Sequence, residues 1–192
     1  PATGWWPDGL PRYMANWRDG QLDGPSIENF PSGMKKSETF YRFGKKEGVA
    51  RQWDERGTLL TEENWQSDHL EGKVREFYSD GKPRSLTPYL AGKKNGRYES
   101  FNPDGTLATS GEFLDGKLQG PITLHYPTGQ PFAVCDYQAD LLTGGRLLYP
   151  DGKELGQFGP ISGKEGKVSF LLLQYPDGKP LSSTRLESST GK

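Results

Sequence analysis

The chain has 192 residues, with 24 basic and 25 acidic side chains and a formal net charge of -1. This balance lacks the basic excess that binding to a phosphate backbone needs, so a nucleic-acid partner is not expected. Hydrophobic residues make up only 32% of the chain, and 26 Gly and 15 Pro indicate many turns. No apolar run approaches the roughly 20 residues of a membrane-spanning helix, so no transmembrane segment is expected.

Three sets of residues recur along the chain at an interval of 24 residues. One set is the glycine of turns of the PDG kind, the next is a second glycine, and the third is an aromatic residue. Such internal periodicity is typical of repeat proteins. The turn glycines are Gly9, Gly33, Gly57, Gly81, Gly105 and Gly129, the second glycines are Gly24, Gly48, Gly72, Gly96, Gly120 and Gly144, and the aromatic column is Trp17, Tyr41, Trp65, Tyr89, Phe113 and Tyr137.

Each repeat contains the same elements in the same order. A column aromatic and a turn of the "DGKLQG" type (115–120) come first, then a short strand ending in another aromatic, a turn of the "YPDG" type and a strand of about eight residues. Turn signals this frequent leave no room for a helix and predict antiparallel hairpins. The predicted fold class is all-β, an antiparallel β-hairpin repeat array that forms one elongated, twisted or curled meander sheet.

The repeats define a single domain over residues 1–192. They are regular from about residue 5 to residue 140, whereas the units at 141–180 lose the strict interval, and residues 181–192 are expected to form a flexible tail. Within the regular part, the segment before the second turn has six residues in some repeats and five in others. Because the two lengths alternate, neighbouring hairpins are expected to bulge differently at one edge.

The aromatic column and the turn glycines are predicted to be structural. A single hairpin cannot bury an aromatic ring, but stacked hairpins bring the rings of neighbouring repeats together. We therefore expect each column ring to cover the next. The glycines at Gly33, Gly57, Gly81, Gly105 and Gly129 are expected to close the turns, since positive φ costs glycine nothing.

This pattern resembles the MORN repeat family, in the shorter variant common in bacterial proteins. The core aromatic-x-x-Gly-Lys-x-x-Gly, as in "FLDGKLQG" (113–120) and "YLAGKKNG" (89–96), carries the resemblance together with the YPDG-like turns. The resemblance covers nearly the whole chain. Asp68 and Asp140 depart from it, because each replaces the first glycine of its turn.

No group of side chains predicts catalysis or metal binding. Cys135 belongs to a repeat column of mostly small residues, which favours a structural filler over a nucleophile. His69 falls in a turn and His125 at an ordinary strand position, and neither has cysteines or carboxylates at ligand spacing. The aspartates of the PDG-type turns are explained by turn formation. The chain is therefore not expected to be an enzyme or to bind a metal or cofactor.

The family resemblance implies a function in binding another protein. Bacterial MORN-variant proteins that this chain is similar to include immunity and antitoxin components, which hold a cognate toxic enzyme inactive. The implied function is an immunity protein that neutralises a toxic effector by steric blocking, and that is a monomer before it binds. The preferred target is a secreted antibacterial phospholipase of a type VI secretion system, which implies the periplasm or envelope, with the cytoplasm as the alternative.

The second candidate function is a scaffold or membrane-surface tether, as the resemblance to eukaryotic members of the wider family implies. Turn lysines such as Lys45, Lys46 and Lys93 are placed where they could touch anionic headgroups, so peripheral membrane contact is compatible with the sequence. Lysines at a sheet edge more often keep that edge soluble and unpaired.

Residues that break the repeat are the expected partner-binding residues, because the fold does not need them to propagate. Trp5 is an extra aromatic beside Trp6, and the strand around Phe170 is the most apolar in the chain, although a terminal cap is the favoured explanation of that strand. Aromatic side chains outside the column are further anchors, since interfaces favour them. The expected partner-binding residues are Trp5, Tyr13, Phe43, Phe77, Tyr98 and Phe170.

Overall fold

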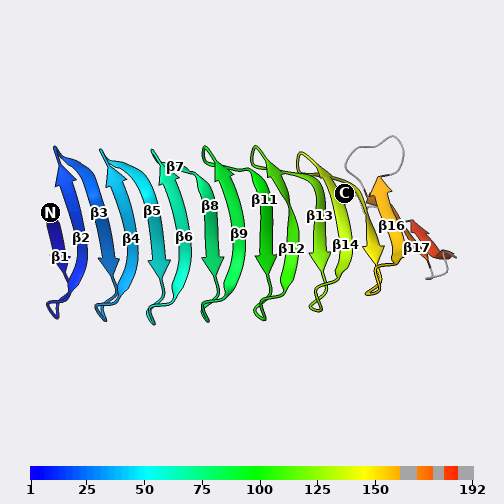
Figure 1. Cartoon of the computed structure of the whole chain (residues 1–192), viewed down its shortest axis with the longest axis horizontal. Coiled ribbons are helices and arrows are strands. Elements are labelled where there is room, and N and C mark those ends of the chain that lie inside the picture. Colours follow the sequence, from blue (N-terminus) through cyan, green and yellow to red (C-terminus); the bar gives the residue numbers. More distant parts are fainter. Residues whose placement is uncertain (161–167, 175–179, 186–192) are drawn as a thin grey trace, which may run out of the picture. The chain divides into compact units, whose positions relative to one another are not determined.

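A computed structural model describes residues 1–160, 168–174 and 180–185, with side chains described as far as residue 159. The described residues form antiparallel strands joined by turns and contain no helix (Figure 1). It follows that no helix of the described part is long and apolar enough to span a membrane. The predicted all-β hairpin array is confirmed. Contacts divide the chain into two compact units, unit 1 (Pro1–Asn95) and unit 2 (Gly96–Lys192).

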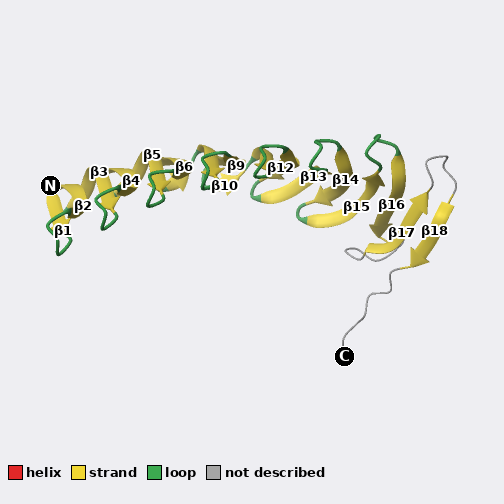
Figure 2. Ribbon diagram, turned by 90° about the horizontal axis from the view of Figure 1, so that it is seen from below, coloured by secondary structure: helices red, strands yellow, loops and turns green. Residues whose placement is uncertain are grey.

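In unit 1 the strands pair antiparallel with their neighbours in the sequence and form a single layer (Figure 2). The two-residue strands β7 and β10 arise where a bulge interrupts a longer strand. The strands of unit 1 are β1 (Ala2–Trp5), β2 (Pro11–Arg18), β3 (Gln21–Asn29), β4 (Lys35–Arg42), β5 (Lys45–Trp53), β6 (Leu59–Gln66), β7 (His69–Leu70), β8 (Gly72–Phe77), β9 (Pro83–Leu90) and β10 (Lys93–Lys94).

Unit 2 repeats the same pairing of sequential strands. Its last strand takes in residues 181–185 of the segment expected to be a tail, and residues 186–192 lie outside the described residues. The strands of unit 2 are β11 (Gly96–Phe101), β12 (Leu107–Leu114), β13 (Lys117–His125), β14 (Pro131–Gln138), β15 (Leu141–Leu148), β16 (Glu154–Pro160), β17 (Val168–Gln174) and β18 (Pro180–Arg185).

Two kinds of turn lie at opposite ends of the strands (Figure 1). In the PDG-type turn, the glycine N–H donates to the carbonyl three residues earlier, as from Gly81 to Tyr78 at 2.8 Å. Its aspartate accepts from the backbone two residues ahead, as Asp80 does from Lys82 at 3.1 Å, and this hydrogen bond is the largest cause of the lowered pKa of Asp80. The opposite turn has two residues of positive φ, the type I′ geometry of tight hairpins.

The alternating segment lengths do not produce different bulges, so that prediction is wrong. Gly57 donates to Asp54 at 3.0 Å just as Gly81 donates to Tyr78 at 2.8 Å, and both hairpins shift register at the same place. Where the aromatic stands one residue earlier, as at Trp53, a polar residue takes the first position of the turn. The repeats with the shorter and the longer segment therefore differ in the side chains at these positions and have the same backbone conformation.

The second-series glycines from Gly24 to Gly120 each lie opposite a column aromatic on the neighbouring strand, which explains their common interval. Gly48 pairs with Trp65 and Gly72 with Tyr89, and both glycines have left-handed backbone, at φ 75° and 77°. Glycine permits this bulge and leaves no side chain against the ring. On its other side Trp65 pairs with Leu70. In unit 1, therefore, successive column rings are separated by a residue of the intervening strand, and do not cover one another directly as expected.

The looser interval after residue 140 also has a backbone cause. Gly144 is the second-series glycine of this repeat, yet its φ is not positive. Between the pairs Tyr137–Leu142 and Cys135–Gly145, the bulged strand contains one residue fewer than at the corresponding bulges of earlier repeats. The smaller bulge shortens the repeat by one residue and leaves the hairpin otherwise unchanged.

Type I′ turns are joined by hydrogen bonds to the preceding repeat, and we call this contact the inter-repeat clamp. The N–H of Gly44 donates to Leu22 O at 2.8 Å, and that of Asp68 donates to Lys46 O at 3.1 Å. The Asp68 carboxylate also accepts from Lys46 N at 2.7 Å. Asp140 makes the same two contacts in unit 2, with Leu118. The two aspartates that replace a turn glycine therefore strengthen the clamp.

One face of unit 1 carries a row of alternating charges across four strands. Glu38 pairs with Arg51, Arg51 with Glu62, and Glu62 with Arg75. The Glu62 carboxylate binds Arg51 Nε at 2.9 Å and Arg75 Nη1 at 2.6 Å. These hydrogen bonds, with Arg51 contributing most, lower the pKa of Glu62. The row forms a cross-strand ladder of opposite charges, a favourable arrangement on a sheet.

Candidate binding surfaces

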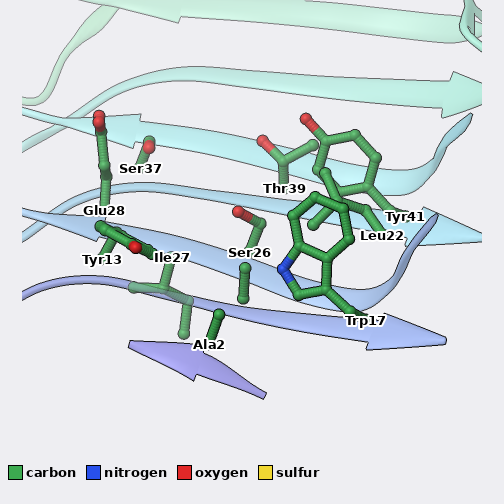
Figure 3. Close-up of a pocket in the computed structure, with 11 residues that line it drawn as sticks. Ala2, Tyr13, Trp17, Leu22, Ser26, Ile27, Glu28, Ser37, Thr39 and Tyr41 are labelled. Atoms are coloured by element: carbon green, nitrogen blue, oxygen red, sulfur yellow. The ribbon is translucent and has the colours of Figure 1, made fainter. Parts of the chain in front are cut away.

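A shallow groove of about 410 Å³ lies on the other face of unit 1, across strands β1 to β4 (Figure 3). Its volume falls within the range of roughly 300–1,000 Å³ that is usual for small-ligand sites. Three rows of side chains line it, each row running from strand to strand. We call them the middle row, the aromatic row and the outer row.

The middle row consists of small residues and forms the floor. Register places Ala15 between Ala2 on β1 and Ser26 on β3, and Thr39 follows Ser26 on β4. Ala15 is only 8% exposed. After Ala50 on β5 the row reaches Glu63 on β6, whose carboxylate accepts a hydrogen bond from Trp65 Nε1 at 2.9 Å. The run of small residues ends there.

The aromatic row forms one wall of the groove and consists of Trp17, Leu22 and Tyr41 (Figure 3). Trp17 pairs with Leu22, and Tyr41 pairs with Gly24, so β3 separates the two rings. Two strand spacings amount to about 10 Å. Trp17 is 52% exposed even though it belongs to the structural column. The wall therefore offers an accessible ring face.

The outer row forms the opposite wall and consists of Tyr13, Glu28 and Ser37 (Figure 3). Tyr13 pairs with Glu28, and Glu28 pairs with Ser37. Tyr13 is 44% exposed, and Glu28 is held by an ion pair with Lys36 at 3.1 Å. The groove thus contains two tyrosines, one tryptophan and one carboxylate that is already paired.

A second candidate surface is the type I′ turn between β4 and β5, which we call the basic tip (Arg42–Lys46). Phe43 stands at its apex with φ 50° and is 61% exposed. The Arg42 guanidinium lies 5.8 Å from the centre of the Phe43 ring. A shallow hollow of about 380 Å³ beside the ring is lined by Arg42, Phe43, Lys45, Glu47 and Ser67.

Within unit 1, the expected partner-binding residues lie on different parts of the sheet and its turns. Trp5 is exposed at β1, Tyr13 lines the groove, and Phe43 caps the basic tip. Phe77 is partly buried, and the Tyr98 ring packs edge-on against Phe113 with 5.5 Å between centres. Phe170 pairs with Arg185 across β17 and β18, and its side chain lies outside the described residues.

Residue-by-residue reasoning missed the groove. Trp17 and Tyr41 belong to the column that is predicted to be structural, and Ala15 and Thr39 fall in the same 24-residue column as Cys135. The sequence does contain a signal for the groove, because the two columns that make up the middle row both hold small residues in unit 1. Strand register is needed to place Ser26 between Ala15 and Thr39.

The residues considered for chemistry have ordinary structural surroundings. Cys135 lies beside Ile122 and Gly145 in the middle row of unit 2, and burial raises the pKa of its thiol, with a smaller effect of Asp136. A thiol with a raised pKa is a weak nucleophile at neutral pH. His69 Nδ1 lies 2.9 Å from the carbonyl of Ser67 within the turn. No three metal-ligating side chains gather among the described residues.

Comparison with known proteins matches one family model to a single repeat of the chain. A family model described as "MORN repeat variant" matches residues 70–91. No curated protein matches the chain.

Among solved structures, "Crystal Structure of TarM" shares 17% identity over 56% of this chain and 19% of that one, with a TM-score of 0.29. An S. aureus TarM mutant in complex with fondaparinux, alpha-GlcNAc-glycerol and UDP shares 16% identity over the same fractions, with a TM-score of 0.27. The chain thus spans about a fifth of the TarM chains it matches. At these scores the likeness supports no argument about fold or function.

The matched segment contains the features that recur in the other repeats. It includes the bulge glycine Gly72, the turn glycine Gly81 and the column aromatic Tyr89, with Gly72 opposite Tyr89. The same pairing occurs between Gly48 and Trp65 in the preceding repeat. Residues 70–91 thus match the MORN repeat variant, and the other repeats of the chain share the features of this segment.

Proposed function

We propose that this chain is an immunity or antitoxin protein, which binds a cognate toxic effector enzyme and blocks it sterically. The observation that carries the proposal is Phe43, an aromatic side chain that is largely in solvent and stands on a backbone conformation that aromatic residues rarely adopt. We propose that Phe43 binds the partner, because neither the fold nor the turn needs an aromatic residue at this position.

The left-handed conformation of Phe43 is unfavourable for a bulky residue. It costs roughly 1–2 kcal/mol for L-residues, less for Asn or Asp and nothing for Gly. A residue that is both strained and exposed is a reason to look for function. The equivalent positions of the other described type I′ turns hold small or polar residues, namely Asp19, Ser67, Ala91, Asp115 and Ala139.

The charge of the basic tip supports an acidic partner surface. Arg42 and Lys45 flank Phe43, and neither forms an ion pair within the described part of the chain. Exposed cations of this kind favour encounter with a negatively charged partner and speed its association. An aromatic anchor surrounded by cations is suited to the mouth of an acidic cleft.

Exposed apolar side chains concentrate in the first two repeats. Clusters of this kind often mark interaction sites on soluble proteins. The large apolar side chains that are exposed there are Trp5, Leu10, Tyr13, Met14, Trp17, Met34, Phe40 and Phe43, against Leu90, Leu114 and Leu141 in the rest of the described side chains.

The tip is held in place by the inter-repeat clamp, because Gly44 N donates to Leu22 O at 2.8 Å. A binding loop fixed on its scaffold loses less conformational entropy on association than a mobile one. Steric blocking by a preformed hairpin needs no chemistry in the inhibitor itself. For the target we propose a secreted antibacterial phospholipase of a type VI secretion system, met in the periplasm or at the envelope.

The test is affinity co-purification from the source cells, with mass spectrometry of the proteins retained after a high-salt wash. The expected result is one stoichiometric enzyme whose toxicity to cells is suppressed by co-expression of this chain. Phe43→Asp should abolish suppression, since Asp19 and Asp115 show that the turn accepts this residue. Leu114→Ala is the matched control, because Leu114 is 55% exposed and lies beside the equivalent turn of unit 2.

The basic tip also favours one alternative, a tether to a membrane surface. Arg42 and Lys45 would then meet anionic headgroups, each worth about 1 kcal/mol near the surface. Flotation with phosphatidylcholine vesicles, with and without phosphatidylglycerol, separates the two functions. Binding to the anionic vesicles that Phe43→Asp abolishes, together with no retained enzyme, would replace inhibition with tethering.

A further inference from the structure

The proposed function rests on Phe43 at the basic tip, and the groove on the first two repeats is a second site with a different lining. Its floor is a strip of small side chains at Ala15, Ser26 and Thr39, and its aromatic wall presents the half-exposed ring of Trp17. A concave site of this kind, with aromatic walls and a few placed polar groups, is typical of small-ligand binding.

The polar atoms of the groove are available to a ligand. The hydroxyls of Ser26, Ser37 and Thr39 line it, and none of them forms a hydrogen bond within the described part of the chain. A hydroxyl both donates and accepts hydrogen bonds. The groove therefore offers several paired donor and acceptor positions to a bound molecule.

The charge of the groove excludes strongly charged ligands. Glu28 is the one charged residue of its lining, and Lys36 already neutralises it at 3.1 Å. A phosphate or sulfate would meet no cation in the lining and one nearby carboxylate. A cationic ligand would have to displace Lys36. The ligand that fits this lining is neutral and rich in hydroxyls.

An oligosaccharide combines the two chemistries that the groove offers. A pyranose ring has an apolar face of C–H bonds, which stacks on indole and phenol rings, and a rim of hydroxyls, which pairs with serine and threonine. Aromatic side chains supply large apolar contact with little loss of conformational freedom. Trp17 and Tyr41 lie on strands that β3 separates and that are about 10 Å apart, so the wall extends beyond a single sugar ring.

We propose that the groove formed by Trp17, Tyr41 and the Ser26–Thr39 floor binds a neutral oligosaccharide non-covalently. The chain stacks sugar rings along the aromatic row and pairs their hydroxyls with the floor. This site is separate from the basic tip and is independent of whether the chain neutralises an enzyme.

The test is titration of the full chain with cellohexaose, chitohexaose and maltohexaose. Isothermal titration calorimetry and tryptophan fluorescence measure the binding of each sugar. At least one probe is expected to bind at micromolar to millimolar concentration. Trp17→Ala should weaken binding at least about tenfold, because it removes most of the apolar contact of the wall. Thr39→Val keeps the shape of the side chain and removes its hydroxyl, so it should weaken binding about threefold to tenfold.

Two further variants separate the site from general effects on the fold. Ser26→Ile fills the floor with a strand-forming residue and should abolish binding while the circular dichroism spectrum is unchanged. Phe43→Asp should bind the sugar as the unmodified chain does, whatever it does to enzyme neutralisation. The proposal would be overturned if none of the three probes bound at millimolar concentration. It would also be overturned if the Trp17→Ala and Ser26→Ile variants bound a probe as tightly as the unmodified chain does.

Discussion

The middle row has opposite characters in the two units, although the hairpins that carry it are alike. In unit 1 it consists of small residues around Ala15, Ser26 and Thr39, and the surface there is hollow. In unit 2 the same row contains Tyr98 and Ile122, with Ile122 only 7% exposed. The difference shows that the repeat backbone sets where side chains lie, while side-chain volume decides whether a face is packed or open.

Packing in unit 2 depends on pairing large residues with glycine. A methyl group added at Gly111 would collide with the Ile122 side chain, and one added at Gly145 would collide with the Phe158 ring and with the Val134 carbonyl. Large and small residues thus interdigitate along the row, as in a close-packed core. Unit 1 has no large partner in the row over the length of its groove.

Truncation of Ile122 gives the largest expected effect. Ile122→Ala should lower the free energy of unfolding of unit 2 by about 3 kcal/mol, as for other buried isoleucines. Ser26→Ala, the matched change in unit 1, should alter stability by less than about 0.5 kcal/mol because the site is open. Urea denaturation with hydrogen exchange assigned to each unit measures both. Equal losses would show that the two rows are packed alike.

The aromatic column should respond unequally along its length. Phe113 packs against Tyr98, so Phe113→Ala should cost about 2–3 kcal/mol. Trp17 is 52% exposed, so Trp17→Ala should lower the free energy of unfolding by about 1 kcal/mol or less. Thermal melts of the two variants compare them directly. A cost for Trp17→Ala as large as that for Phe113→Ala would mean that its ring is covered.

The inter-repeat clamp is the feature that the two units share, and it predicts equal effects. Asp68 and Asp140 each accept from a backbone N–H at 2.7 Å and have φ of 68° and 71°. Replacing either with Ala should cost about 1–2 kcal/mol, because the acceptor is lost and alanine is strained at positive φ. Faster exchange of the Lys46 or Leu118 amide reports the loss. The glycine variants keep the backbone relaxed and isolate the carboxylate.

Acid should weaken unit 1 through the paired charges at Glu62, whereas in the corresponding row of unit 2 the uncharged Ser110, Thr123 and Val134 separate Glu99 from Arg146. The pKa of Glu62 in the folded chain is below its ordinary value of 4.5. Its stabilising contribution is therefore present above pH 4.5 and lost as pH falls through the folded pKa.

The contribution of Glu62 at neutral pH should be about 1 kcal/mol, because both arginines are partly exposed and the pairs are screened. Urea unfolding of Glu62→Gln between pH 7 and pH 3 measures it. The variant should be less stable at neutral pH and less sensitive to acid. Identical acid curves for the variant and the unmodified chain would contradict the assignment.

The smallest expected effect has the opposite sign. Phe43→Asp should stabilise unit 1 by about 0.5–1 kcal/mol, since Asp tolerates the left-handed conformation better than Phe does. Unit 2 has no such strained aromatic, and its equivalent turns already hold Asp115 and Ala139. A thermal melt measures the gain. Loss of stability would show that Phe43 makes contacts that hold the turn.

The sequence predicted the hairpin array because period and turn chemistry are local properties. Gly81 and its equivalents close turns through a bond to the residue three positions earlier, and such bonds follow from the four-residue turn itself. The sequence does not show that turns beginning at Asp54 and Tyr78 share one backbone conformation, because the position of the aromatic residue alternates while the hydrogen bonds do not. A side-chain pattern cannot separate a change of side chain from a change of backbone without the hydrogen bonds.

Prediction of the groove failed for a different reason. Ala15 and Thr39 belong to one 24-residue column, and Ser26 and Ala50 belong to another. Only the pairing of strands shows that these four side chains form one row. A column can be recognised from its 24-residue interval in the sequence. A row depends on the register of the paired strands, and the bulge at Gly24 shifts that register.

The inter-repeat clamp makes every junction in unit 1 interchangeable with the next. The turn N–H groups of Gly44, Asp68 and Gly92 donate to the carbonyls of residues 22, 46 and 70, which stand one repeat earlier. A gene that gains or loses a multiple of 24 codons by unequal recombination keeps the spacing of each of these bonds. The array can therefore lengthen or shorten by whole repeats during evolution. A surface that runs along the array can change its extent in this way while the individual strands stay the same.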